Sequence, residues 1–218
     1  MVRLIGGADE AGRGPVIGPL VVAGVSMDER SVQSLKKRGV RDSKTLAPRL
    51  RAALYDEILR TSSRVASVMI QPDQIDEVVR AGKKYRKLNY LEAIYFAKVA
   101  DELGAYEVIV DASDSSPRRF RDVILENMRR KCRVLAAHKA DRDYTVVSAA
   151  SIIAKVERDR AIEKLKRKLG DFGSGYPSDP VTRAFFLEKM RRDEPLPDQV
   201  RKSWKTLESL HQTLLAPL

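Results

Sequence analysis

The stretch GADEAGRGPVIGPLVVAG, residues 7–24, joins a charged half to an apolar half. The apolar half, PVIGPLVVAG, has the composition of a buried strand, and its glycines indicate bends. The charged half places the adjacent acids Asp9 and Glu10 at the end of a short apolar segment, directly before a GRG turn. We therefore expect two strands joined by a glycine-rich turn, with negative charge concentrated where the first strand ends.

Beyond this stretch, the spacing of apolar residues predicts a mixed α/β fold. Strands are predicted at residues 3–8, 15–27, 64–71, 106–113 and 131–141. The clearest amphipathic helix is predicted at 87–104, and a long helix rich in Ala, Ile and Lys is predicted at 143–170. Another helix starts at the Ser116–Pro117 pair. This order of elements predicts one mixed sheet flanked by helices, followed from residue 171 by a small helical region.

The composition describes a soluble protein with a strongly basic surface. Apolar residues make up 43% of the 218, and no apolar run approaches the roughly 20 residues of a membrane helix. The N-terminal residues lack a signal-peptide pattern and the single Cys132 fits a reducing compartment, so we expect a cytoplasmic protein. The net charge of +11 favours a polyanionic partner such as nucleic acid, although ion-pair networks of a heat-adapted protein would also need many charged residues.

Acidic residues terminate several of the predicted strands. Asp9 ends the first strand, Asp111 ends the run YEVIVD, and Asp141 ends RVLAAHKAD. If these strands are neighbours, their ends meet at one sheet edge, and Glu10 reaches the same point. Carboxylates gathered there could not all stay ionised without cations, and oxygen ligands favour Mg²⁺ or Mn²⁺. A helix cap or a turn is the other common role of an acid after a strand, so the spacing alone leaves both interpretations open.

Short motifs are spread in order over nearly the whole chain. They are DEAGRGP (9–15), DSK (42–44), LN (88–89), VDASD (110–114), KADRDYTVVSAASIIAKVERDR (139–160), GSGYPSDP (173–180) and VRKSWKTL (200–207). Together these motifs resemble those of the ribonuclease HII family, most of all its archaeal branch. The first motif combined with the long KAD segment is highly specific for that family.

The resemblance implies a ribonuclease H-like fold, which is α/β with a central mixed five-stranded sheet flanked by helices. It implies a catalytic domain over residues 1–170 and a C-terminal helical, substrate-binding region over 171–218. The family's catalytic, metal-binding acids match Asp9, Glu10, Asp111 and Asp141. The implied cofactor is a pair of Mg²⁺ or Mn²⁺ ions. These acids are the same ones that the strand ends bring together.

The resemblance also implies contacts with the substrate. The matching positions are Gly12, Arg13, Gly14, Ser43, Lys44 and Tyr176, with Asn89 and Lys155 as further nucleic-acid contacts. The GRG loop is implied to recognise the ribonucleotide, and Asp159 to lie close to the site. Tyr176 is implied to sense the junction between RNA and DNA, although its ring could instead pack the surrounding loop onto the sheet.

The implied activity is that of a metal-dependent endoribonuclease. It would hydrolyse the RNA strand of RNA/DNA hybrids and incise DNA 5′ of embedded ribonucleotides by two-metal-ion catalysis, leaving 5′-phosphate and 3′-hydroxyl ends. A monomer with this activity would serve ribonucleotide excision and RNA primer removal in DNA replication and repair. Two alternatives remain from the sequence, a junction-cleaving nuclease of the same fold and a hybrid-binding module without activity.

The C-terminal residues HQTLLAPL suggest a possible protein partner. Gln212, Leu215 and Leu218 have the spacing of a tail that binds a sliding clamp. The paired aromatic residues that are usual in such tails are missing here. An ordinary helix end is therefore the alternative interpretation.

Overall fold

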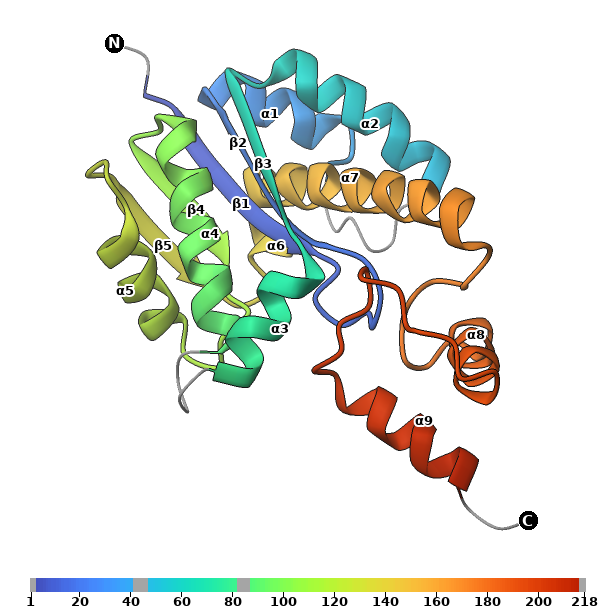
Figure 1. Ribbon diagram of the computed structural model, residues 1–218. Coiled ribbons are helices and arrows are strands. Elements are labelled where there is room, and N and C mark those ends of the chain that lie inside the picture. Colours follow the sequence, from blue (N-terminus) through green and yellow to red (C-terminus); the bar gives the residue numbers. More distant parts are fainter. Residues whose placement is uncertain (1–2, 41–46, 82–86, 216–218) are drawn as a thin grey trace.

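The centre of the molecule is a mixed five-stranded sheet with strand order β3-β2-β1-β4-β5 (Figure 1). The structure is a computed structural model that describes residues 3–40, 47–81 and 87–215. The strands are β1 (Ile5–Ala11), β2 (Leu20–Met27), β3 (Arg64–Ile70), β4 (Glu107–Asp111) and β5 (Arg133–Ala137). β2 pairs antiparallel with both β1 and β3, whereas β1, β4 and β5 run parallel. The predicted fold class is therefore confirmed.

Helices cover both faces of this sheet. The described helices are α1 (Glu29–Lys37), α2 (Pro48–Thr61), α3 (Pro72–Ala81), α4 (Leu88–Leu103), α5 (Pro117–Asn127), α6 (Ala140–Asp143), α7 (Thr145–Leu169), α8 (Pro180–Arg191) and α9 (Lys205–Leu215). In Figure 1, α7 lies with α1 and α2 on one face, and α4 lies with α3 and α5 on the other. Alternate side chains of β2 enter the two cores, Leu20 and Val22 on one face and Val21 and Ala23 on the other. Burial on both faces explains the continuous apolar sequence of β2.

A glycine allows β1 and α7 to pack closely. A Cβ atom on Gly7 would lie 2.3 Å from the carbonyl carbon of Val146, in the first turn of α7. Real side chains are not found at such a distance, so only glycine fits at this position. The contact places α7 directly on the strand that carries Asp9 and Glu10.

The boundaries of the first two strands differ from the prediction. β1 is longer than predicted, so Asp9 and Glu10 lie inside the strand rather than after it. β2 is shorter, because the residues between the strands form a loop in which Gly12 and Gly18 have φ values of 90° and 93°. These left-handed conformations favour glycine and interrupt the extended backbone.

The C-terminal helices share an apolar core with the start of the chain. Phe186 of α8 and Leu210 of α9 are fully buried in one cluster with Val16 and Ile17. A β-bridge joins Ile17 to Val200, so the segment before α9 runs beside the loop that connects β1 to β2 (Figure 1). None of the helices in the described ranges has the combined length and apolar character needed to cross a membrane.

Candidate active site

Two of the predicted acids lie at the ends of adjacent parallel strands. Ala8 of β1 is paired with Val110 of β4, which places the next residues, Asp9 and Asp111, side by side. Asp141 approaches from the connection after β5. One carboxylate oxygen from each of these three acids lies within 4.8 Å of the other two. Each of these acids follows an apolar run in the sequence, and they were therefore expected to meet at one edge of the sheet. The structure brings them together there.

Asp141 reaches this cluster by a route that differs from the predicted one. β5 ends before Lys139, which adopts a left-handed conformation with φ of 58°, and Asp141 lies in the short helix α6. The backbone N–H of Ala140 donates to Asp111 Oδ1 at 3.2 Å, which ties α6 to the end of β4. The predicted strand is therefore too long at its C-terminal end, because the chain turns before it reaches the acid.

Two of the three acids are buried, which disfavours their charged form. Asp9 is 4% exposed and Asp141 is 1% exposed. Burial, together with the carboxylates of Asp111 and Asp141, raises the pKa of Asp9 from 3.8 to about 7. A hydrogen bond from Ser151 acts in the opposite direction. A cation would relieve the repulsion, and carboxylate oxygens are the ligands that Mg²⁺ and Mn²⁺ prefer, so these residues fit a divalent metal ion.

Glu10 lies on the opposite face of β1 from Asp9, because successive side chains of a strand alternate. Burial, followed by the charges of Asp9 and Glu92, raises the pKa of Glu10 well above 4.5. Its Oε2 atom is buried and has no hydrogen-bond partner among the described residues. A buried carboxylate oxygen without a partner is unfavourable, so Glu10 also fits a cation ligand.

A cavity of about 320 Å³ joins the acids to the glycine-rich loop. It is lined by Asp9, Glu10, Ala11, Gly12, Arg13, Gly14, Asp111, Ser151, Lys155 and Tyr176. Residues that are far apart in the sequence thus share one cavity: the acids of two strands, the GRG loop, a lysine of α7 and the tyrosine before α8. Ser43 and Lys44, which were also predicted to contact the substrate, lie outside the described residues.

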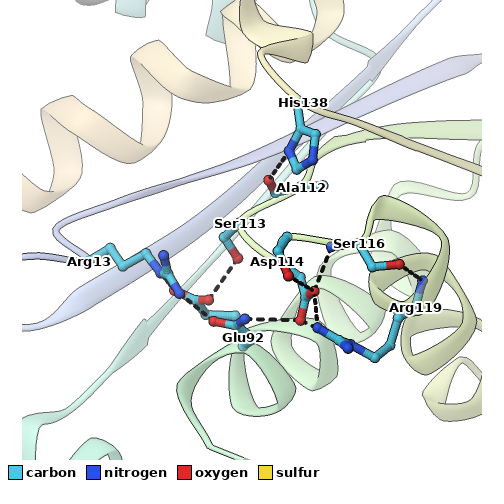
Figure 2. A network of polar contacts seen from close by, with 10 residues as sticks. Arg13, Glu92, Ala112, Ser113, Asp114, Ser116, Arg119 and His138 are labelled. Atoms are coloured by element: carbon cyan, nitrogen blue, oxygen red, sulfur yellow. Dashed lines mark hydrogen bonds and ion pairs between the residues drawn. The ribbon is translucent and has the colours of Figure 1, made fainter. Parts of the chain in front are cut away.

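The Arg13 side chain is held by a polar network that the sequence did not reveal (Figure 2). Its Nε donates to Glu92 Oε1 at 2.9 Å, and its Nη2 donates to the side chain of Asn89. Ser113 Oγ donates to the second oxygen of Glu92 at 2.7 Å. Asn89 Nδ2 in turn donates to Asp114 Oδ2 at 2.9 Å. Arg13 and Asn89, which were predicted to contact the substrate, therefore form hydrogen bonds with each other and with protein carboxylates.

Glu92 is the central acid of this network, and it was not predicted from the sequence as a site residue. It is fully buried, and burial raises its pKa, whereas Arg13 and Ser113 act in the opposite direction. An acid within the apolar run LNYLEAIYF of α4 was the available signal, since a charged residue on a buried helix face needs a partner.

Tyr176 lies against the glycine-rich loop. One ring carbon is 3.4 Å from the position that a Cβ atom on Gly14 would take. The Arg158 guanidinium lies 5.4 Å from the ring centroid and donates to the backbone oxygen of Ser174 at 3.1 Å. The tyrosine is nevertheless 37% exposed. Its ring is therefore packed on one side and accessible on the other.

Basic side chains extend from the cavity along α7. Lys155 lines the cavity and donates to Asp159 at 3.1 Å. Asp159 also pairs with Arg51 at 3.6 Å and with Arg158 at 3.5 Å, so this acid neutralises basic groups and lies apart from the three-acid cluster. A neighbouring groove between α2 and α7 has a basic lining that includes Arg51, Arg160, Lys164 and Arg167. Such a surface suits the phosphates of a nucleic acid.

A buried arginine in the C-terminal segment holds the glycine-rich loop. Arg201 has no exposed surface, and its Nη2 donates to the carbonyl oxygens of Gly12 at 2.6 Å and Gly18 at 3.0 Å. Its Nη1 donates to the carbonyl oxygen of Arg13 at 2.8 Å. Burial and the nearby Arg158 lower the pKa of Arg201 to about 10, so the guanidinium stays charged at neutral pH. The sequence placed this residue in the VRKSWKTL motif without a role.

Comparisons with known proteins agree with this geometry. The family model described as Ribonuclease HII matches residues 6–207. Ribonuclease HII of Pyrococcus furiosus is 43% identical over 97% of this chain and 93% of its own length. The crystal structure of ribonuclease H2 from Pyrococcus horikoshii OT3 has a TM-score of 0.88 and 40% identity, covering 98% of this chain and 100% of that chain. A chain of the PCNA:RNase HII complex from Archaeoglobus fulgidus has a TM-score of 0.85 and 42% identity, covering 95% and 97%.

The family model spans the first strand, the acid cluster and the Arg201 segment. The archaeal relatives match this chain over nearly their full length and have the same backbone arrangement. All residues of the site therefore lie within the matched part of the chain. The chain therefore belongs to the ribonuclease HII family and is a metal-dependent endoribonuclease.

Proposed function

We propose that the protein hydrolyses the RNA strand of RNA/DNA hybrids and incises DNA on the 5′ side of embedded ribonucleotides, leaving 5′-phosphate and 3′-hydroxyl ends. The observation that carries the proposal is the shared cavity, in which the strand acids face the GRG loop and Tyr176. A phosphate bound at the acids would have its sugar beside the loop. Such an activity would serve ribonucleotide excision and removal of RNA primers.

The acids are the groups that we expect to hold divalent ions. Two ions, Mg²⁺ or Mn²⁺, would be held by Asp9, Glu10, Asp111 and Asp141. When bound, such ions supply an activated water and stabilise the leaving 3′ oxygen. The protein's part is to fix the carboxylates, through the hydrogen bond of Ser151 to Asp9 and that of the Ala140 amide to Asp111. Burial strengthens their attraction for a cation.

The GRG loop and Tyr176 are expected to recognise the sugar. The 2′-hydroxyl distinguishes RNA from DNA. Because Gly12 and Gly14 have no side chains, their backbone groups can approach a ribose closely. The accessible face of Tyr176 offers an aromatic surface for the neighbouring deoxyribose. Arg13, bound to Glu92, fixes the loop from the α4 side.

Positive charge is expected to hold the rest of the duplex. We assign catalysis to residues 1–170 and assign substrate binding to residues 171–218, which contribute Tyr176 to the cavity. Lys155 and the basic groove between α2 and α7 are placed to contact phosphates. Asn89 is expected to act with them. All of these groups come from one chain, which supports a monomer as the active unit.

A sliding clamp is a proposed protein partner. The relative from Archaeoglobus fulgidus was solved as a PCNA:RNase HII complex. In this chain, Gln212 is exposed on α9, the last described helix, and Leu218 lies outside the described residues. We propose that the residues from Gln212 onward dock on a PCNA ring.

The proposed function is tested by incubating the protein with a DNA duplex that contains one ribonucleotide and mapping the product ends. We expect a single cut 5′ of the ribonucleotide that depends on Mg²⁺ or Mn²⁺. Asp111→Asn should remain folded and lose at least about a hundredfold in rate, because one negative ligand is removed from the cluster. An all-DNA four-way junction is the control substrate.

Cleavage of the junction, but not of the ribonucleotide duplex, would contradict the proposed specificity. Tight binding of the hybrid without any cut would indicate a binding module instead. Near-normal metal-dependent activity of Asp111→Asn would exclude this residue from the metal site.

A further inference from the structure

The orientation of the GRG loop is not determined by its own sequence. Glycine populates many backbone conformations, so a loop containing Gly12, Gly14 and Gly18 needs an external contact to hold one of them. We propose that Arg201 is the positioning residue that directs the N–H groups of Arg13 and Gly14 toward the ribonucleotide. This inference rests on the proposed function of the loop.

The Arg201 guanidinium connects both ends of the loop. It donates to the carbonyl oxygens of Gly12 at 2.6 Å and Arg13 at 2.8 Å, at the start of the loop. It also donates twice to the carbonyl oxygen of Gly18, from Nε at 3.1 Å and from Nη2 at 3.0 Å. An arginine can bind several carbonyls at once because its N–H donors lie in one plane at fixed angles. The guanidinium therefore fixes the loop as a unit.

The direction of these carbonyls determines the direction of the adjacent amides. In a trans peptide, the C=O of one residue and the N–H of the next point in opposite directions, and the described residues contain no cis peptide bond. Because the carbonyls of Gly12 and Arg13 point to Arg201, the N–H groups of Arg13 and Gly14 point away from it. Neither N–H has a protein acceptor within the described part of the chain, and both residues line the cavity. Adjacent amides of this kind form a concave donor site for an oxygen atom.

The segment that carries Arg201 is anchored independently of this side chain. The backbone N–H of Arg201 donates to Val16 O at 2.8 Å. Asp76 of α3 accepts the backbone N–H groups of Lys202 at 2.7 Å and Ser203 at 2.9 Å. The guanidinium is therefore presented to the loop from a fixed backbone.

A purely structural role does not explain a charged side chain at this position. Within the described residues, the hydrogen bonds of the Arg201 side chain all go to carbonyl oxygens, and no carboxylate lies within ion-pair distance of it. A fully buried charge without a carboxylate partner is unfavourable, and an apolar side chain would fill the same space. The guanidinium also lies 5.0 Å from the Trp204 ring centroid, but its directional hydrogen bonds all go to the loop carbonyls. Binding of these carbonyls is the contribution to the loop that an apolar side chain could not make.

The test compares Arg201→Met with the parent in the full-length protein. Two quantities are measured: the preference in binding for a duplex with one ribonucleotide over the same all-DNA duplex, without divalent ions, and kcat and KM for its cleavage with Mg²⁺. We expect the binding preference and kcat to fall by on the order of 10- to 100-fold, as for a misplaced recognition group. Arg201→Lys, which keeps the charge and one donor group, should recover part of the preference.

Val200→Ala is the matched control. It removes buried apolar contacts from the adjacent position of the same segment but leaves the guanidinium in place. We expect its unfolding temperature to fall while its ribonucleotide preference stays at the parent value. If Arg201→Met behaves in the same way, losing stability and keeping the preference, the positioning role is overturned. If Arg201→Met does not fold, the preference of Arg201→Lys decides: a parent value overturns the role and a reduced one supports it.

Failure of the proposed function is distinguishable from failure of this inference. A parent protein with no preference for the ribonucleotide duplex contradicts the proposed function itself. In that case, the backbone ¹⁵N–¹H signals of Arg13 and Gly14 in the free protein still test Arg201. Broadened or multiple signals in the Arg201 variants, but not in Val200→Ala, support loop positioning, and unchanged signals overturn it.

Discussion

At the scale of single residues, the site contains acids whose charged form is unfavourable in the folded protein. Asp9 is almost fully buried beside two other carboxylates, and its pKa of about 7 shows how strongly the folded protein resists its ionisation. An unfolded chain would ionise the same residue near its ordinary value of 3.8. The folded protein without metal therefore becomes less stable as the pH rises between these two values.

Asp9→Asn should consequently stabilise the metal-free protein at high pH and not at low pH. Well below pH 3.8, both states of the parent hold the Asp9 proton, so the substitution has little effect. Toward pH 7, the advantage of the variant should grow by about 1.4 kcal/mol for each pH unit and then level off. Thermal unfolding of both proteins with a chelator, from about pH 2.5 to pH 8, measures this difference.

Added Mg²⁺ provides the control for this prediction. At about pH 8 it should raise the unfolding temperature of the parent more than that of Asp9→Asn, because a ligand that binds only the folded state stabilises it. A stability difference that stayed constant across the pH range would show that Asp9 does not titrate as the burial requires.

Tyr176→Ala should reduce cleavage at a single embedded ribonucleotide more than it reduces hybrid binding. The accessible face of the ring can contribute roughly 1–3 kcal/mol by stacking on a sugar or base, so a loss of about tenfold or more is expected. Tyr176→Phe keeps the ring and its contacts with Gly14 and Arg158, and it should keep most of the activity. Equal cleavage by Tyr176→Ala and the parent would leave the ring only a packing role.

The residues of the site were predictable to different degrees. The acids could be found because each interrupts or follows an apolar strand, which is a local pattern. Glu92 had a signal, an acid within an apolar helix, but its partner and those of Arg201 could not be predicted, because they lie 79 and up to 189 residues away in the chain. Contacts over such separations exist only after the sheet and the C-terminal segment have come together, and no local periodicity reports them.

At the scale of elements, the packing of β1 against α7 positions both sides of the cavity. β1 carries Asp9 and Glu10, and α7 carries Ser151 and Lys155. The two elements approach so closely at Gly7 that any Cβ atom there would overlap the backbone of α7. The separation of the acids from the groups on α7 therefore depends on this glycine.

Gly7→Ala should destabilise the protein strongly and lower its activity. The added methyl group must displace helix backbone, and overpacking of this kind costs about 1–3 kcal/mol or more. Gly6→Ala is the matched control in the same strand, because its Cβ atom would meet only side-chain atoms, at 3.1–3.2 Å. Denaturant unfolding of both variants should show the larger loss for Gly7→Ala, and equal losses would contradict the close approach of β1 and α7.

Elements were predicted more reliably than their ends. The five strands and the long helices α4 and α7 lie where apolar spacing placed them, because each has a clear buried face. The errors occur at β1, β2 and β5, where boundaries depend on left-handed residues such as Gly12, Gly18 and Lys139. A left-handed lysine has no sequence signal comparable to that of glycine, so the turn before Asp141 could not be foreseen.

At the scale of the whole molecule, the C-terminal region is joined to the catalytic face through a common core. Leu210 of α9 is fully buried in the cluster that contains Val16 and Ile17. The tail that is proposed to bind a clamp therefore begins only after this residue. A truncation that tests the tail must retain Leu210, since its removal would disturb the core as well.

Truncation after His211 should weaken binding to an archaeal PCNA by at least about tenfold, because it removes Gln212 and the proposed docking residues that follow. It should leave the unfolding temperature close to that of the full chain, since the buried Leu210 is retained and Gln212 is exposed. Gln212→Ala is the point-variant control. Equal clamp affinity of the truncated and full-length proteins would show that the tail is an ordinary helix end.

The position of Arg201 in the chain also determines when the GRG loop can be completed during synthesis. Translation produces the GRG loop first and Asp141 later, and the arginine that binds the loop carbonyls follows Gly12 by 189 residues. Because a chain begins to fold from its N-terminal side while it is being made, the sheet can form before the loop has its partner. A nascent chain that has not yet reached Arg201 thus carries the acids without the finished loop, and the proposed recognition of the ribonucleotide waits until this residue has been added.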